Sequence, residues 1–361
     1  MLSTDPALDA RKATTLQTFD VMAAGELEDF AAVVHPDFFN HEQRDEPPAT
    51  RGPRLEQIHG VAEWLRAAFG RPRWEVHEIV AEDDLVVAHV TMAGRHTGDF
   101  VAYDVEGRVD SAFAATGKGF ATTQTHWHRL RDGLIAEHWA QRDDFGTAEQ
   151  LGWNAPTPFY LLRCALAKRR AVRAADPPHR AQERPFARWR GTPDDAKALA
   201  LRAVNLMCGG RLQAFETVYH HDARTRRLVL GPPLAPAPGP ATFRIAARWL
   251  TDAFADLEWV VHHVVSERDL VAVHLTLSGR HSAPLAFYHQ GGALGSVFPP
   301  TGRSFATQQT HWLRLTDDGR VAEHWVNRDD LGMAMQLGWV PPTPAYLVRM
   351  AAARSRARAT V

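Results

Sequence analysis

Residues Ala121–Trp153 read ATTQTHWHRLRDGLIAEHWAQRDDFGTAEQLGW, and residues Ala306–Trp339 read ATQQTHWLRLTDDGRVAEHWVNRDDLGMAMQLGW. About two thirds of these positions match, with a single one-residue gap. The same register, an offset of about 185 residues, extends back through Gly94-Arg95-His96 and Gly279-Arg280-His281. A repeat of this length indicates two copies of a whole domain rather than a solenoid of short units.

The length of 361 residues fits two domains of ordinary size. We expect the first domain at residues 1–162 and the second at 194–349, with a tail at 350–361. Between them, residues 163–193 are rich in Arg, Ala and Pro. This segment is expected to be a solvated linker or a joining helix, although a basic run can also touch RNA or acidic lipid.

The composition narrows the class of protein. The hydrophobic share is 45%, the charged share 23% and the net charge −1, which favours neither nucleic acid nor an anionic membrane as partner. The two cysteines, Cys164 and Cys208, lie at non-equivalent places, so no disulfide framework or cysteine zinc site is indicated. Without a signal-peptide pattern or a long apolar run, a cytoplasmic location is expected.

Each copy changes from a helical to a strand period along its length. In the first copy the spacing predicts helices over residues 16–34 and 55–69, and then strands over 74–80, 85–92, 120–130 and 134–141. The second copy repeats this plan with helices over 195–218 and 243–254, separated by a proline-rich loop at 231–240. Helices followed by a strand meander predict an α+β fold with helices over one face of a curved antiparallel sheet.

The order of several short motifs resembles the SnoaL-like polyketide cyclase family, also known as ester cyclases, within the nuclear transport factor 2-like superfamily. The motifs are VHPDFFNH at residues 34–41, where the first helix is expected to end, RGP at 51–53, GRHTG at 94–98, TGK at 116–118, DGLIAEHW at 132–139, Asp143 and QLG at 150–152. The resemblance covers nearly all of both copies. It implies a tandem of cone-shaped α+β barrels, each a bent sheet wrapped around helices with a deep apolar cavity.

The family resemblance also implies a chemistry. Such cyclases close a ring by aldol chemistry without metal or organic cofactor, using one acid/base side chain and polar groups that stabilise an enolate. Family members usually carry this acid/base as an Asp directly after the Trp of the last strand. That position holds Ala140 in the first copy and Val326 in the second.

Histidines are the remaining titratable candidates on the cavity side. Because strand side chains alternate, Gln124, His126 and His128 share one face, which the resemblance places toward the cavity together with His138. We expect the pair His126 and His138, or its equivalent His311 and His324, to form the catalytic group, with His138 in the acid/base role left vacant at Ala140. Two hydrogen-bonded histidines of a polar pocket without catalytic function are the alternative.

Further candidates come from the neighbouring segments. Asn40 and His41 are expected to contact substrate, as are Gln124, His128, His96 and Trp64, while Asp143 would orient a histidine or serve a structural role. A turn role for Asn40, an Arg-Asp pair at Asp143 and a core role for Trp64 are the alternatives. His126-x-His128 also allows zinc binding, but no metal is expected because the second copy has Leu313 in place of His128.

The sequence therefore predicts a cofactor-free enzyme that performs cyclisation, isomerisation or dehydration on an apolar, possibly polyketide-like, carbonyl compound. A non-catalytic ligand-binding or scaffold protein and a hydrolase that activates water between His138 and Asp143 are the alternatives. The first copy is expected to be the more active, because only it has Asn40, His41 and His128. The two domains are expected to pack as an intramolecular pseudo-dimer, with a homodimer also possible.

Overall fold

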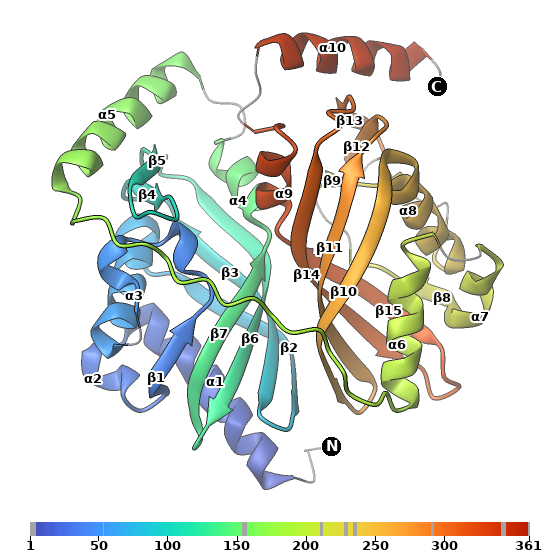
Figure 1. Cartoon of the computed structure of the whole chain (residues 1–361), viewed down its shortest axis with the longest axis horizontal. Coiled ribbons are helices and arrows are strands. Elements are labelled where there is room, and N and C mark those ends of the chain that lie inside the picture. Colours follow the sequence, from blue (N-terminus) through green and yellow to red (C-terminus); the bar gives the residue numbers. More distant parts are fainter. Residues whose placement is uncertain are drawn as a thin grey trace. The chain divides into compact units, whose positions relative to one another are not determined.

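The computed structural model describes residues 5–52, 54–153, 157–209, 212–226, 230–233, 237–289, 292–340 and 344–359. The chain divides into two compact units, Met1–Phe186 and Ala187–Val361 (Figure 1). Pro53 of the RGP motif and the last two residues of the expected tail lie outside the described residues. The exact domain and linker bounds remain predictions.

The core of unit 1 is a mixed five-stranded sheet with the order β1-β7-β6-β3-β2. β1 runs parallel to β7, and the other neighbouring strands are antiparallel. β4 and β5 form a separate hairpin. The strands are β1 (Val34–Asn40), β2 (Arg73–Glu82), β3 (Leu85–Arg95), β4 (Phe100–Tyr103), β5 (Val109–Phe113), β6 (Gly119–Arg131) and β7 (Leu134–Arg142).

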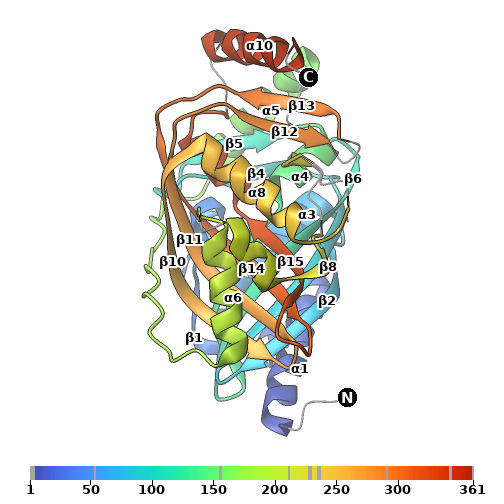
Figure 2. The same cartoon turned by 90° about the vertical axis from the view of Figure 1, so that its right-hand side faces the viewer.

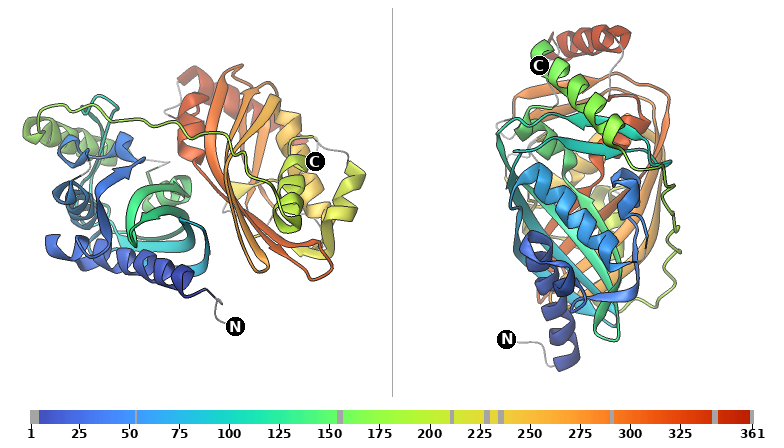
Figure 3. Two further views of the ribbon diagram at one scale, coloured as in Figure 1. Left: turned by 60° about the horizontal axis from the view of Figure 1, so that its bottom comes forward. Right: turned by 90° about the vertical axis from the view of Figure 1, so that its left-hand side faces the viewer.

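Helices α1 and α3 pack against the sheet of unit 1 (Figure 3). α1 begins where the Asp5 side chain accepts a hydrogen bond from the backbone N–H of Ala7, with Pro6 in the first turn. The helices are α1 (Pro6–Ala24), α2 (Leu27–Phe30), α3 (Leu55–Phe69), α4 (Asp144–Leu151) and α5 (Pro158–Ala174), with short 3-10 helices η1 (Gln43–Asp45) and η2 (Pro48–Thr50).

Unit 2 repeats this plan with the strand order β10-β11-β14-β15-β8, in which β8 runs parallel to β15. A three-stranded sheet, β13-β12-β9, occupies the place of the hairpin in unit 1. The strands are β8 (Tyr219–Arg224), β9 (Leu230–Gly231), β10 (Phe254–Glu267), β11 (Leu270–His281), β12 (Leu285–His289), β13 (Leu294–Phe298), β14 (Ser304–Leu315) and β15 (Val321–Arg328).

Helices α6 and α8 lie over the sheet of unit 2 (Figure 2). The helices are α6 (Asp195–Leu206), η3 (Leu212–Ala214), α7 (Phe215–Val218), α8 (Pro240–Ala253), α9 (Asp330–Gln336) and α10 (Pro344–Ala359). Among the residues that the structure describes, no helix is both long and apolar enough to cross a membrane.

The expected fold class is confirmed: each unit combines a mixed five-stranded sheet with helices, as a tandem α+β duplication requires. The helix predicted over residues 55–69 is α3, and the four predicted strands of the first copy fall within β2, β3, β6 and β7. The turns that join these strands place Asp83 and Asp132 at positive φ, a conformation that Asp tolerates better than most residues.

Two predicted helices are wrong in extent. The helix expected over residues 16–34 starts at Pro6 and ends before Gly25, and VHPDFFN at 34–40 is strand β1 instead of a helix end. Pro36 removes a helix donor, and pairing with β7 supplies strand partners that lie far away in sequence. The helix expected over 195–218 ends at Leu206, close to Gly209, which has a φ of 106°.

The segment that follows α5 is partly attached to unit 1 through the buried side chain of Arg51. This guanidinium donates to the carbonyls of Val105 and His179 at 3.1 and 2.6 Å, and the backbone N–H of Ala181 donates to Val105 O at 2.8 Å. Arg51 also donates to the carbonyls of residues 44, 46 and 104. One arginine therefore fixes the loop before α3, the β4–β5 turn and the segment that follows α5.

Replacement of Arg51 should destabilise unit 1 strongly. Arg51→Gln leaves several buried carbonyls without a donor, and each costs about 1–3 kcal/mol, so we expect a loss of about 3–5 kcal/mol in the free energy of unfolding. Chemical denaturation of the full chain measures it, with the exposed Arg71→Gln as the control, expected within about 0.5 kcal/mol of wild type. Equal stability of the two variants would contradict this assignment.

Candidate functional site

Strands β6 and β7 bring two predicted histidines together in unit 1. His126 lies opposite Ala140, and His128 lies opposite His138. The ring nitrogens His126 Nδ1 and His138 Nε2 are 2.9 Å apart. The antiparallel register thus turns two histidines that are 12 residues apart in sequence into one hydrogen-bonded pair.

The pair of unit 1 continues at both ends into amide side chains. His138 Nδ1 lies 3.1 Å from Asn40 Oδ1, and His126 Nε2 lies 2.9 Å from Gln124 Oε1. Asn40 Nδ2 donates to Glu46 Oε1 at 2.7 Å. Burial raises the pKa of Glu46 to about 8, so this carboxyl is largely protonated at neutral pH.

Unit 2 builds the same pair with a different end group. His311 Nδ1 and His324 Nε2 are 2.8 Å apart, and His311 Nε2 lies 3.2 Å from Gln309 Oε1. His324 Nδ1 is 2.8 Å from the hydroxyl of Tyr219, a fully buried residue of β8. A phenol therefore stands where unit 1 uses the amide of Asn40.

The side chains at the two ends of each histidine pair determine which ring nitrogens must carry a proton. In unit 1 both ends are amide oxygens, which only accept: Trp74 Nε1 donates to Gln124 Oε1, and the backbone N–H of Glu42 donates to Asn40 Oδ1. The three hydrogen bonds of the row, Asn40 to His138, His138 to His126 and His126 to Gln124, then each need a proton on an imidazole nitrogen. Two neutral imidazoles carry only two such protons. In unit 2 the hydroxyl of Tyr219 can donate or accept, so a neutral pair satisfies every contact in the row.

Burial keeps the paired histidines neutral. It lowers the pKa of His324 to about 3 and the pKa values of His126, His138 and His311 well below the usual range of histidine. Neighbouring histidines and arginines lower the pKa further for His126, His138 and His311. A neutral imidazole is the form that accepts a proton, so both pairs are in the state that general-base chemistry requires.

A cavity of about 460 Å³ reaches the pair of unit 2. His311, His324 and Gln309 all line it, together with Val326. The remaining wall is mainly apolar and aromatic, and includes Phe243, Trp249, Leu250, Phe254, Trp259, Leu277 and Leu285. The volume is that of a site for a small organic molecule.

In unit 1 an aromatic side chain contacts the corresponding pair, whose two rings are nevertheless more exposed than those of unit 2. The ring of Phe19 from α1 lies edge-on to His126, with centroids 5.3 Å apart, and it also contacts His128 at 6.1 Å. The residue at the equivalent position of α6 is Val204, a smaller side chain. The expectation that the first copy is the more active stays a prediction.

The position that is expected to carry an acid in the family lies opposite one histidine of each pair. Ala140 lies directly opposite His126, and Val326 lies directly opposite His311. His138 and His324 lie two residues earlier on the last strand, and each also contacts the end group of the hydrogen-bonded row. The cross-strand partner of this position is therefore the histidine on β6 or β14.

Asp143 and its equivalent Asp329 serve as helix N-caps. Asp143 Oδ1 accepts from the backbone N–H of Gly146 at 2.8 Å, and Asp329 Oδ1 accepts from that of Gly332 at 2.7 Å. Each cap starts the short helix after the last strand, as Asp does at this position in many helices. The geometry gives Asp143 a structural function, and an orienting role for it stays a prediction.

The other predicted contact residues of unit 1 lie apart from the pair, except His128. His41 stacks on Phe186 at 4.5 Å and lies 3.4 Å from Glu137 Oε2. Trp64 donates to the carbonyl of Val101, and His96 packs on Trp153. His128 is buried 5.1 Å from His138, and burial lowers its pKa to about 3.

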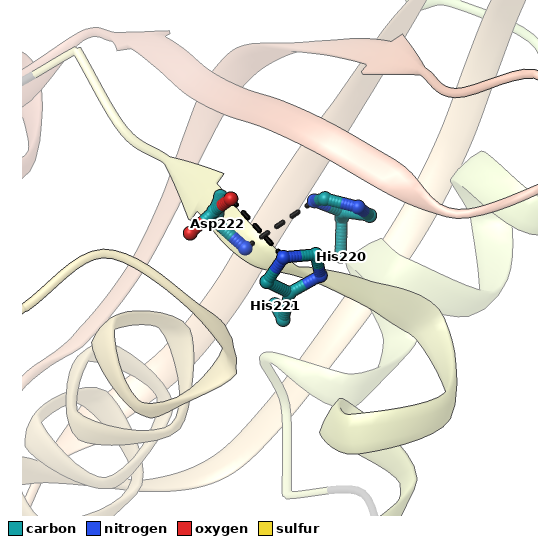
Figure 4. Close-up of side chains that lie close together, drawn as sticks. All are labelled: His220, His221 and Asp222. Carbon is teal, nitrogen blue, oxygen red and sulfur yellow. Dashed lines mark hydrogen bonds and ion pairs between the residues drawn. The ribbon is translucent and has the colours of Figure 1, made fainter.

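Figure 4 shows His220, His221 and Asp222 of β8, the group of possible metal ligands that converges in the described part of the chain, with ligand atoms within 4.8 Å of one another. None of the three lines the cavity. The backbone N–H of Asp222 donates to His220 Nδ1 at 3.3 Å, and Asp37 and His35 repeat this contact in unit 1. The arrangement is thus a shared feature of the edge strand.

Sequence reasoning missed Tyr219, Glu46 and Phe19. Aligned by the repeat, Tyr219 matches Val34, and the polar candidate matching Asn40 was Thr225, which is exposed. Tyr219 reaches His324 from the start of β8 because its side chain is long. The signal in the sequence was the tyrosine at position 219, where the first copy has a valine. It could have indicated a polar group particular to the second copy.

The family match falls separately on each of the two copies. A family model described as SnoaL-like polyketide cyclase matches residues 13–151 and again residues 197–337. An aklanonic acid methyl ester cyclase of Streptomyces peucetius is 32% identical over 136 residues, which is 37% of this chain and 85% of that protein. A nogalonic acid methyl ester cyclase of Streptomyces nogalater is 30% identical over 129 residues, which is 36% of this chain and 87% of that protein.

Solved structures also match one copy at a time. The structure of a SnoaL-like polyketide cyclase from Jannaschia sp. CCS1 is 20% identical, has a TM-score of 0.35, and covers 44% of this chain and 100% of its own. IdmH from Streptomyces antibioticus is 25% identical with a TM-score of 0.31, and covers 39% of this chain and 98% of its own. Each relative named here thus corresponds to about one unit of the present chain.

The buried histidines should make stability depend on pH. An unfolded histidine takes up a proton near pH 6.5, whereas His324 does so only near pH 3, so its contribution is complete above about pH 7 and is lost as pH falls toward 3. At pH 5 the loss is on the order of 2 kcal/mol for this residue. Glu46 acts in the opposite sense, because its raised pKa favours the folded state at low pH.

The measurement is the difference between wild type and His324→Gln in chemical denaturation from pH 7.5 to pH 5. Because Glu46 is present in both proteins, its contribution cancels. Wild type should lose stability relative to the variant by up to about 1.4 kcal/mol per pH unit below pH 6.5. Parallel pH curves would show that His324 is charged in the folded protein.

Proposed function

This chain belongs to the SnoaL-like polyketide cyclase family, and from that premise we propose that unit 2 is a cyclase-like enzyme without a cofactor. Its substrate is a largely apolar small molecule with a carbonyl group, and its reaction begins with proton transfer. The named relatives are cyclases of aklanonic and nogalonic acid methyl esters. Cyclisation is therefore the first reaction to test, with isomerisation and dehydration sharing the same initial step.

One observation carries the assignment to unit 2: the cavity of about 460 Å³ that is lined by His311 and His324. Its apolar walls can bury a ring-containing substrate, while the histidine pair supplies a polar point of contact. A neutral base beside a bound carbonyl compound is the minimum that enolate formation requires.

His311 is the proposed base, because it lies opposite Val326 and beside Gln309 in the cavity lining. Its Nε2 would take the proton from the carbon next to a carbonyl, which leaves an enolate. The enolate carbon would then attack a second carbonyl carbon of the same molecule and form the new carbon–carbon bond. The resulting alkoxide would recover the proton from His311 Nε2, so the reaction balances without an oxidant or reductant.

His324 and Tyr219 are proposed as positioning residues for this base. For His311 Nε2 to present a lone pair, its Nδ1 must carry the proton and donate to His324 Nε2. His324 Nδ1 must then donate to Tyr219, whose hydroxyl can accept as readily as it can donate. Because the phenol can donate or accept, donor and acceptor can exchange roles in each hydrogen bond of the row. No contact between these three residues is lost when they do.

Unit 1 is proposed to have no turnover of its own. Phe19 packs on its histidine pair. Residues that follow α5 contact the end of β1 and the residue after it: Arg184 lies 3.7 Å over the ring of Phe39, and Phe186 stacks on His41. These contacts support the binding or scaffold alternative for this copy alone. Catalysis is then proposed for unit 2.

A matched pair of substitutions separates the two copies. His311→Gln should lower turnover at least about 100-fold, because it removes the base, whereas His126→Gln should change it less than about threefold. Aklanonic acid methyl ester is the first probe, followed by deuterium uptake from D2O and by product formation. Loss of activity only in His126→Gln would assign catalysis to unit 1, and absence of turnover for every bound carbonyl compound would support a binding protein.

The role of Tyr219 can be tested separately. Tyr219→Phe keeps the ring but removes the hydroxyl, so kcat should fall about tenfold and KM should change little, with a shifted pH dependence of kcat. Tyr346→Phe is the control, because the hydroxyl of Tyr346 donates to Pro299 O at 2.8 Å and the residue does not line the cavity. An unchanged kcat and pH profile in Tyr219→Phe would rule out this positioning role.

A further inference from the structure

The charged side chains in the described lining of the unit 2 cavity are all arginines. Arg224, Arg226 and Arg328 line it, and none of the described residues of the lining is Asp or Glu. The two histidines of the lining are neutral because burial lowers their pKa. An apolar cavity with arginines as its charged groups attracts anions, since low-dielectric walls strengthen the field of those charges.

Arg328 is already neutralised by a carboxylate. Its Nε and Nη2 lie 3.0 and 3.2 Å from the two oxygens of Asp330. Both side chains are largely buried, with exposed fractions of 14% and 21%. Nη2 donates a hydrogen bond to the carboxylate, and the close ion pair holds the guanidinium against it. Arg328 is therefore part of the wall and not the contact for a ligand.

Arg226 is held in place by an aromatic ring and by a carboxylate that it shares with a second arginine. Its guanidinium carbon lies 3.8 Å over the ring of Trp325, and its Nη2 lies 3.3 Å from Glu323 Oε2. The same Glu323 oxygen also lies 3.7 Å from Nε of Arg314. Stacking on an aromatic ring fixes the plane of the guanidinium, which lowers the entropy that a further hydrogen bond would cost.

Arg224 adds a second positive charge at the solvent-facing end of the cavity. Its side chain is exposed, and within the described parts of the chain no carboxylate lies within 4 Å of its guanidinium. Arg224 and Arg226 both belong to the segment at the end of β8. The open end of an apolar cavity thus carries two arginines from one short segment.

The comparison of the two copies shows that this charge is particular to the second. Arg224 and Arg226 replace Phe39 and His41 of the first copy. Over the following residues, Glu42 and Glu46 of the first copy correspond to Arg227 and Gly231 of the second. The copy with the cavity has gained positive charges and lost negative ones around the same strand end.

We propose that the cavity of unit 2 binds an acid: an apolar, ring-containing molecule whose carboxylate contacts Arg224 and Arg226 while its ring body lies toward His311. This inference rests on the proposed function for the identity of the site and adds the chemical class of its ligand. It differs from the relatives, whose names refer to methyl esters, in which the carboxyl group carries no charge.

The test compares an acid with its own ester in binding to the full chain. Anthraquinone-2-carboxylate and its methyl ester share ring size and carbonyl groups and differ in charge. Titration calorimetry at pH 7.5 should give the acid at least a tenfold lower Kd than the ester. The preference should shrink as ionic strength rises, because the arginines are exposed to solvent.

Variants assign the preference to the two arginines. Arg224→Gln and Arg226→Gln should each weaken binding of the acid at least fivefold and leave binding of the ester unchanged, while Arg226→Lys should restore part of the loss. Arg320→Gln is the matched control, because it removes the same charge from unit 2 outside the cavity lining. It should leave both Kd values unchanged.

The outcomes separate this inference from the proposed function. A preference for the acid that the arginine variants abolish, without turnover of any acid or ester, supports the acid site and contradicts the enzyme. Equal binding of acid and ester, with turnover that depends on His311, overturns the acid site and leaves the enzyme intact. Absence of binding by both probes, or a preference that survives in both Gln variants, also overturns the acid site.

Discussion

The hydrogen bond between two imidazoles on neighbouring strands is the interaction on which the rest of each site depends. It exists because β6 pairs with β7, and β14 with β15, in a register that sets the rings side by side. A buried imidazole pair costs free energy unless its outer nitrogens also find partners. Gln309 and Tyr219 supply them for a neutral pair in unit 2, whereas in unit 1 Gln124 and Asn40 both present acceptor oxygens, so a neutral pair satisfies two of the three contacts.

The same polar row has two different surroundings, and these surroundings separate the copies. In unit 1, Phe19 contacts the pair, and Arg51 anchors the linker segment on the neighbouring loop. In unit 2 a cavity with aromatic walls and arginines in its lining reaches the pair. A duplicated domain can keep the same row of hydrogen bonds while its surroundings change, because the row also contributes to the folded state. The proposed assignment of catalysis to unit 2 rests on these surroundings.

Sequence patterns predicted the sheet well and the ends of the helices poorly. β2, β3, β6 and β7 alternate in burial or form apolar runs that are joined by short turns, so they could be located from local signals alone. β1 could not, because residues 34–40 become a strand only through parallel pairing with β7, about 100 residues later in the chain. Among the site residues, the His126 and His138 pair followed from side-chain alternation, whereas Tyr219 comes from a strand whose existence had not been recognised.

The sequence by itself determined the duplication, the α+β class, the family and the histidines that face one another, because each of these depends on a repeated or periodic pattern of residue types. Only the tertiary structure decided which side chains line the cavity of unit 2, which histidine lies opposite Val326, and which arginines take part in that lining. These properties depend on volumes and distances between segments remote in sequence, such as Phe19 against His126, or Arg226 against Trp325. Residue types fix what each group can do, and packing fixes which groups meet.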